Sequence, residues 1–147
     1  MHKLDHTDQY KINHLLEVNL KGSLNIASAC LPYMREQGYG RIIYISSVLA
    51  THNVLGTAIY SSCKAFIDRL VKSISAENIS KGITCNSIQL GYFDAGLTYK
   101  LPNPEEYKAK IPLKRWGKID ELISTIDYII NTEYLTGSNI PLNGGVN

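Results

Sequence analysis

The first third of the chain carries apolar residues at spacings of three and four. The stripe consists of Ile12, Leu16, Leu20, Leu24, Ala27, Leu31 and Met34. It follows Thr7 and Asp8, either of which can cap a helix. The spacing predicts an amphipathic helix over residues 8–37, ended by Gly38. A second apolar face predicts that this helix is buried on two sides. Its members are Leu15, Val18, Ile26 and Cys30.

Two short segments predict strands. Residues 42–45 form a continuous apolar run between glycine and serine, which is typical of a strand covered on both faces, as in a parallel sheet. Residues 83–90, followed by Gly91, predict the second strand. Gly91 would then lie at the carboxyl end of its strand, where parallel-sheet proteins bind ligands.

The remaining segments alternate with these strands. Residues 58–81 carry a helical apolar stripe, and a third helix opens at Asp120. Residues 92–117, rich in proline and glycine, predict an irregular loop, and residues 138–142 predict a short edge strand. The order of helix, strand, helix, strand, loop, helix and strand predicts an α/β fold with parallel strands and right-handed crossovers.

Composition narrows the class of protein. A length of 147 residues with 44% hydrophobic and 19% charged residues is typical of one soluble domain. The net charge of +2 is spread along the chain, so no nucleic-acid partner is predicted. No apolar run reaches about 18 residues, so no membrane span is predicted. Three cysteines without zinc-ligand spacing favour reduced thiols, a cytoplasmic location and no metal site. They are Cys30, Cys63 and Cys85.

The candidate chemistry lies between Ser47 and Lys64. Tyr60 and Lys64 are four residues apart, so a helix would place them on one face. A nearby ammonium is expected to lower the phenol pKa from its ordinary value of about 10, which suits a general acid or base. Ser47, at the end of a predicted strand, could hold a carbonyl or alcohol against the phenol. A plain packing role for Tyr60 is the alternative.

Asn19 interrupts the apolar pattern of the first helix. An exposed amide would need no explanation. A buried amide would need partners, because an unpaired buried polar group costs about 1–3 kcal/mol.

Several segments, in order and at matching spacing, resemble the short-chain dehydrogenase/reductase family, of the type that includes 3-oxoacyl-acyl carrier protein reductases. The segments are residues 18–22, residues 40–47, the Tyr-x-x-x-Lys of residues 60–64, residues 82–86 with Gly91, residues 111–117, and residues 135–137 with Gly144 and Gly145. They cover nearly the whole chain.

The resemblance implies roles for individual residues. Tyr60 would give a proton to the carbonyl or take one from the alcohol. Lys64 would lower the pKa of Tyr60 and bind the nicotinamide ribose, and Ser47 would hydrogen-bond the substrate oxygen. Asn19 would hold a water that links Lys64 to solvent.

The family's cofactor is NADP or NAD, with NADP favoured by the resemblance alone. It would supply the hydride, which no side chain can. Besides Tyr60 and Lys64, the resemblance places Gly91 and Phe93 among the cofactor-binding residues.

The chain departs from the family pattern at its start. It has no Gly-rich turn before the first helix to cradle a pyrophosphate, and it lacks the residue that selects NAD or NADP. Leu90 stands where the family usually has proline, and Ala95 where threonine is common. Residues 1–147 are therefore expected to form a single partial Rossmann domain that lacks the N-terminal cofactor-phosphate half. Residues 42–45 would then form an edge of the sheet.

The function expected from the resemblance is interconversion of a small-molecule carbonyl and alcohol, with 3-oxoacyl thioesters as a candidate substrate class. A non-catalytic remnant or interaction module that pairs with a homologous subunit is the alternative. An epimerase or dehydratase is a third reading, against which residues 115–117 weigh. A homo-oligomer through helices 8–37 and 58–81, or a complementing N-terminal half, is the expected partner.

Overall fold

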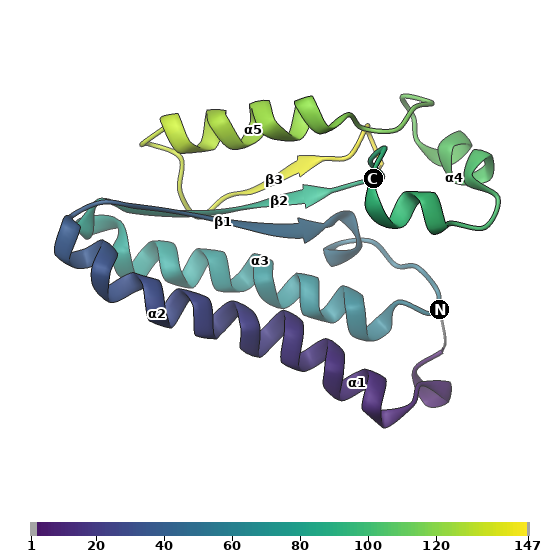
Figure 1. Ribbon diagram of the computed structural model, residues 1–147, viewed down its shortest axis with the longest axis horizontal. Helices are drawn as coiled ribbons and strands as arrows, with labels where there is room; N and C mark the ends of the chain where they lie inside the picture. The colour runs from purple at the N-terminus through teal and green to yellow at the C-terminus, as the bar shows by residue number, and fades with distance from the viewer. Residues whose placement is uncertain (1–2, 147) are drawn as a thin grey trace.

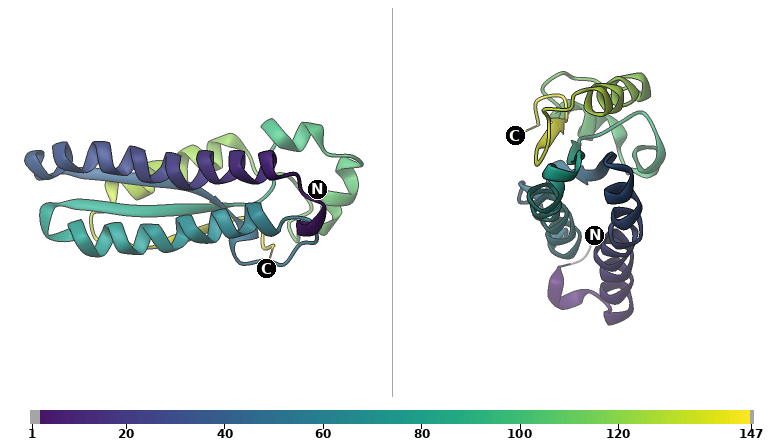
Figure 2. Two further views of the ribbon diagram at one scale, coloured as in Figure 1. Left: turned by 90° about the horizontal axis from the view of Figure 1, so that it is seen from below. Right: turned by 90° about the vertical axis from the view of Figure 1, so that its left-hand side faces the viewer.

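The computed structural model describes residues 3–146, in which a three-stranded parallel sheet lies between helical layers (Figure 1). Helices α2 (Gly22–Gln37) and α3 (Ala58–Asn78) cover one face of the sheet, with α1 (Gln9–Leu16) packed against α3, and α5 (Ile119–Asn131) covers the other face. Figure 2 shows α1 and α2 running beside α3 along the length of the sheet. This arrangement confirms the predicted α/β fold with parallel strands.

The sheet is built from β1 (Gly40–Ser47), β2 (Ile83–Leu90) and β3 (Asn139–Leu142), with β2 in the centre. Ser47 pairs with Leu90, and Leu90 pairs with Leu142, so the carboxyl ends of all three strands meet at one end of the sheet. That alignment places the loops after the strands side by side.

β1 forms an open edge of the sheet within the described residues, as predicted. The Gly40 N–H donates to the Gly82 carbonyl of the β2 side. Because backbone groups alternate in direction along a strand, the even-numbered residues of β1 face β2 and the odd-numbered residues face the open edge. Its side chains alternate too: Ile42 and Tyr44 pack on the α2–α3 side, while Ile45 is 42% exposed.

The first helical region begins at the predicted place, with the Asp8 carboxylate accepting the Tyr10 N–H at 3.2 Å. It comprises α1 (Gln9–Leu16), a π-helical turn (Glu17–Lys21) and α2 (Gly22–Gln37). The π-helical turn, which the apolar spacing did not predict, contains Asn19.

The sequence predicts a helix buried on two sides, and within the described residues of the single chain only one of the two apolar faces is covered. Ala27 and Leu31 are buried against the sheet, whereas Val18 and Ile26 on the second face are 57% and 66% exposed. The strands β1 and β2 and the helix α3 cover only one face of α2. The second face is left as an apolar surface toward solvent.

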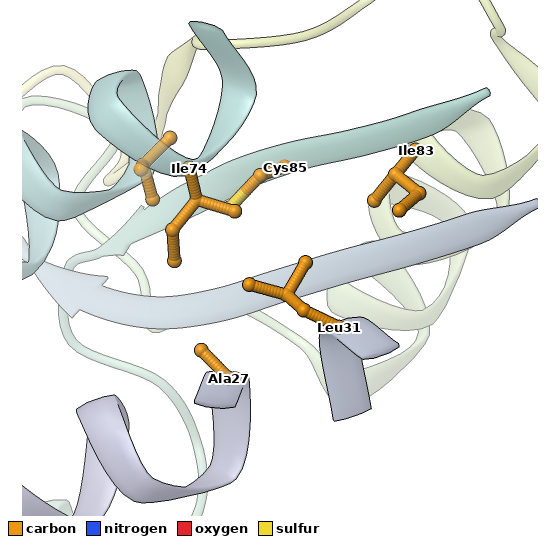
Figure 3. Close-up of a cluster of buried hydrophobic side chains, with 6 residues drawn as sticks. Ala27, Leu31, Ile74, Ile83 and Cys85 are labelled. Atoms are coloured by element: carbon orange, nitrogen blue, oxygen red, sulfur yellow. The ribbon is translucent and has the colours of Figure 1, made fainter. Parts of the chain in front are cut away.

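Helix α3 (Ala58–Asn78) continues into a 3-10 turn (Ile79–Lys81) and matches the predicted helix 58–81. Its apolar side joins α2 and the sheet in one core (Figure 3). The buried members of that core are Ala27, Leu31, Val71, Ile74, Ile83 and Cys85. This packing fixes the position of α3, whose first turns carry Tyr60 and Lys64.

The loop predicted over residues 92–117 is partly helical, so that prediction is wrong. A 3-10 helix (Gly96–Lys100) and α4 (Pro104–Lys110) lie within it. Proline is tolerated at the first position of a helix, where its missing N–H would have no partner. Pro104 therefore begins α4 instead of preventing it.

The last helix, α5 (Ile119–Asn131), begins beside the predicted Asp120. Ile129 is buried against the sheet, while Ile119 and Ile123 are 43% and 51% exposed. Among residues 3–146, no helix combines the length and apolarity needed to span a bilayer.

Candidate active site

The residues that the sequence singled out meet at the carboxyl end of the sheet. Ser47 ends β1, Gly91 follows β2, and Tyr60 lies in the first turn of α3. These elements surround a cavity of about 330 Å³. Its lining residues are Ser47, Leu49, Gly56, Thr57, Tyr60, Gly91, Tyr92, Thr98, Leu101 and Tyr107. The Ser47 and Tyr60 side chains therefore share one cavity.

The Tyr60 phenol is half-buried beside Ser47. Burial raises the pKa of Tyr60, and a hydrogen bond with the Ser47 side chain offsets part of that rise. Ser47 itself is 8% exposed, and its hydroxyl oxygen accepts the Leu49 N–H at 3.2 Å, which fixes the side chain. The expected lowering of the Tyr60 pKa is wrong for the described residues, because burial outweighs the other influences on the phenol.

Lys64 lies one helical turn after Tyr60, as predicted. Its Nζ is 5.5 Å from the centre of the Tyr60 ring and donates to the Ile45 carbonyl at 3.0 Å. The ammonium thus lies near the ring, while the influences on the Tyr60 pKa are burial, Ser47 and Cys63. Burial lowers the pKa of Lys64, while Cys63 and Asp68 act in the opposite direction.

Asn19 lies in the π-helical turn, which packs against α3. Its side-chain amide donates to the Leu15 carbonyl at 3.0 Å, and its own carbonyl accepts the Ser23 hydroxyl at 2.6 Å. The half-buried amide therefore has a local partner. The Gly22 N–H donates to the Glu17 carbonyl, five residues back, and such π-helical turns are frequent at functional sites. A water held by Asn19 remains a prediction.

Gly91 is required by close packing. A β-carbon at this position would lie 2.7 Å from the Asn143 Cα, and the Gly91 N–H donates to the Leu142 carbonyl at 3.0 Å. Phe93 is 8% exposed, and its ring lies where a side chain on Gly117 would be. Its backbone is therefore the part of Phe93 that is left to contact a cofactor. The cofactor roles of Gly91 and Phe93 remain predictions.

The described residues fit one part of a nicotinamide cofactor. The Lys64 ammonium carries three hydrogens, one of which goes to Ile45, so donors remain for the hydroxyls of a ribose. Between residues 3 and 146, no Gly-rich turn links a strand to a following helix, so these residues offer no cradle for the pyrophosphate. Within the same range, no cluster of three or more His, Cys, Asp or Glu could hold a metal ion.

A comparison with protein families identifies the chain. The family described as enoyl-(acyl carrier protein) reductase matches residues 1–147. The chain belongs to the short-chain dehydrogenase/reductase family. This is the family that the Tyr-x-x-x-Lys segment, the serine strand and the other segments predicted from the sequence.

Individual short-chain dehydrogenases and reductases are similar over part of their length. The acetoacetyl-CoA reductase of Allochromatium vinosum is 34% identical over 136 residues, which cover 90% of this chain and 55% of that protein. The 3-oxoacyl-[acyl-carrier-protein] reductase FabG of Thermotoga maritima is 32% identical over 136 residues, with coverages of 90% and 55%. The chain spans just over half the length of these relatives.

A solved short-chain dehydrogenase/reductase structure has the same fold. The gluconate 5-dehydrogenase of Burkholderia cenocepacia, in complex with NADP and tartrate, superposes with a TM-score of 0.93 at 28% identity. The match covers 99% of this chain and 59% of that one. The sheet and helices described above are therefore a Rossmann-type arrangement.

The sequence did not single out an aromatic cluster, two of whose rings, Tyr92 and Tyr107, line this cavity. The Tyr92 ring lies 5.8 Å from the Tyr107 ring and 6.1 Å from the Trp116 ring. These residues come from the loop after β2, from α4 and from the segment before α5, and they share no spacing pattern. In the sequence, only the frequency of aromatic residues over 92–116 indicated that such a cluster forms.

Proposed function

We propose that this chain provides the proton-transfer and substrate-binding residues of an NAD(P)-dependent oxidoreductase that interconverts a carbonyl and an alcohol. The observation that carries the proposal is the meeting of the Ser47 and Tyr60 side chains in one cavity, with Lys64 over the Tyr60 ring. The bound cofactor would supply or accept the hydride. NADP is the favoured form, because the gluconate 5-dehydrogenase with the same fold is described with NADP.

Ser47 and Tyr60 have different roles at the substrate oxygen. Ser47 donates a hydrogen bond that orients the carbonyl. Tyr60 gives its proton to the same oxygen as the carbonyl is reduced, and takes it back in the reverse direction. Because burial raises the pKa of Tyr60, the phenol is protonated near neutral pH and is ready to donate. Lys64 lies 5.5 Å from the centre of the ring and offers its free hydrogens to the ribose.

The cavity favours uncharged substrates. Its walls are leucine, tyrosine and threonine side chains, and no lysine or arginine is among the described lining residues. Burial of a carboxylate without a cationic partner is costly, whereas a ketone with an apolar chain needs only the Ser47 and Tyr60 donors. The names of the acetoacetyl-CoA and 3-oxoacyl reductases that the chain resembles support 3-oxoacyl thioesters as the substrate class.

We predict that the cavity distinguishes a thioester from the corresponding free acid. Acetoacetyl-pantetheine should bind at least about tenfold more tightly than acetoacetate, since even about 1.4 kcal/mol of unpaired burial produces that ratio. Titrations monitored through the resonances of Tyr92 and Tyr107 would measure both affinities. Equal binding of the two compounds, or tighter binding of the acid, would contradict the proposed substrate class.

Cofactor binding tests the proposal most directly. Calorimetric titration of the purified chain with NADPH and NADH, with gel filtration of the same sample, should give saturable binding. Saturation would mean that a second copy or a complementing half completes the site. A folded sample that binds neither nucleotide would favour the interaction module. The observation behind that alternative is the apolar face of α1 and α2, where Val18, Ile26 and Tyr33 are 57%, 66% and 72% exposed.

A further inference from the structure

Asp68 is a buried acidic residue that the proposed chemistry does not use. It is 7% exposed, and within residues 3–146 it is the one charged side chain among the buried residues. It lies on α3, four residues after Lys64, so the two side chains project from the same face of the helix. An acidic group buried one turn from the predicted catalytic lysine calls for a physical reason.

Two side chains of the central strand hold the Asp68 carboxylate. The Ser87 hydroxyl donates to Oδ1 at 3.0 Å, and the Gln89 amide donates to Oδ2 at 2.6 Å. Ser87 and Gln89 are two residues apart on β2 and therefore face the same helix. Ser87 Oγ also lies 2.9 Å from Asn139 Oδ1 on β3, which extends the network across the sheet.

The edge strand contributes to the same turn of α3. The Ser46 hydroxyl of β1 donates to the Lys64 carbonyl at 3.4 Å. Polar contacts from β1 and β2 thus converge on the turn from Lys64 to Asp68. Beyond this turn, Val71 and Ile74 pack in the apolar core, and Ser75 and Asn78 make separate contacts with Thr136 and Arg35. The contacts with Ser46, Ser87 and Gln89 are therefore the ones that hold the part of α3 carrying Lys64.

We propose that Asp68 is a positioning residue that acts on the site through Lys64, by its charge and by anchoring the Lys64 turn to the sheet. The inference rests on the role of Lys64 in the proposed function. A carboxylate that accepts a bond on each oxygen is fixed in place, and a fixed negative charge in a buried environment is weakly screened. It therefore stabilises a positive charge one turn away more effectively than an exposed acid would.

The electrostatics of Lys64 agree with this geometry. Burial lowers the pKa of Lys64, and Cys63 and Asp68 oppose that shift. Burial raises the pKa of the Cys63 thiol, so this thiol is neutral near pH 7 and Asp68 remains as the opposing charge.

Other ionisable groups lie on α3 and on the elements packed against it. They are Tyr60, Arg69, Lys72 and Glu77 on α3, Arg41 and Tyr44 on β1, Cys85 on β2, Tyr10, Lys11 and His14 on α1, and Glu17 and Lys21, paired with each other, in the π-helical turn. None of these groups is among the causes of the Lys64 shift, which are burial, Cys63 and Asp68.

The test is the ionisation of Lys64 in the intact chain. Nuclear magnetic resonance of the lysine side chains, with Lys64→Arg to assign the signal, gives the pKa of Lys64 without cofactor or substrate. Asp68→Asn should lower that pKa clearly. Ser87→Ala is the matched control, because it removes a hydrogen-bond donor but keeps the charge, and it should shift the pKa much less.

An unchanged pKa of Lys64 in a folded Asp68→Asn variant would overturn the proposal, and so would equal shifts in Asp68→Asn and Ser87→Ala. If Asp68→Asn does not fold, Asp68→Ser tests the same loss of charge in a smaller side chain. Failure of both neutral variants to fold would make Asp68 a structural residue and would also overturn the proposal. None of these results depends on turnover, so they are separate from a failure of the proposed function, which the Tyr60→Phe variant detects.

Discussion

Tyr60→Phe should abolish reduction of an uncharged ketone by this chain. Removal of the hydroxyl takes away the proton donor, while the ring that lies under the Lys64 ammonium is retained. Loss of a general acid typically lowers the rate by about 10²–10⁴-fold. Oxidation of NADPH in the presence of acetoacetyl-pantetheine, followed by absorbance, would measure the effect on kcat and on kcat/KM.

The loss should be specific to this hydroxyl. Tyr33→Phe makes the same chemical change at a position that is 72% exposed on α2, away from the cavity, and should leave the rate unchanged. Binding of NADPH to Tyr60→Phe should remain within a few-fold of the unmodified chain, since Lys64 is still present. Turnover that survives in Tyr60→Phe would rule out the proposed role of this residue.

Gly82→Ala should destabilise the fold far more than Gly38→Ala does. Both glycines adopt a left-handed conformation, with φ of 70° and 63°, and both end helical segments. An alanine in this conformation costs about 1 kcal/mol at either position. At Gly38 a new β-carbon meets nothing within 4 Å, whereas at Gly82 it would lie 2.3 Å from the Gly38 carbonyl oxygen.

That oxygen belongs to the backbone and cannot rotate away, so the chain after α2 or the start of β2 must move. We therefore expect Gly82→Ala to lower the free energy of unfolding by about 2–4 kcal/mol and Gly38→Ala by about 1 kcal/mol. Urea unfolding of the two variants, monitored by circular dichroism, gives both values. Equal losses would show that the close approach of Gly82 to Gly38 does not constrain the fold.

The local sequence pattern was sufficient to predict the helix and strands that position the site. β2 occupies the predicted residues 83–90, which are bounded by Gly82 and Gly91. α3 and the placement of Ser47, Tyr60 and Lys64 followed from apolar spacing, a strand end and one motif. In each case the residues that decide the structure are close together in the sequence.

Most of the features that the sequence did not predict depend on contacts between residues that are far apart in the chain. The second apolar face of α2 looks buried in the sequence, yet burial depends on which elements lie beside it. The pKa of Tyr60 depends on how much protein covers the phenol, which a four-residue spacing does not reveal. The partners of Asp68 are 19 and 21 residues away on another element, so nothing near Asp68 indicated them. The sequence does not predict α4, because a proline within a segment rich in proline and glycine also suits an irregular loop.

The open edge of β1 links the sheet to Lys64. Ile45 is odd-numbered, so its carbonyl faces away from β2, and this is the oxygen that receives the Lys64 ammonium. Any strand that pairs along this edge would direct a backbone N–H at the same oxygen. The N–H of an added strand and the Lys64 ammonium would then compete for one carbonyl oxygen. Extension of the sheet is therefore expected to change how Lys64 is held beside Tyr60.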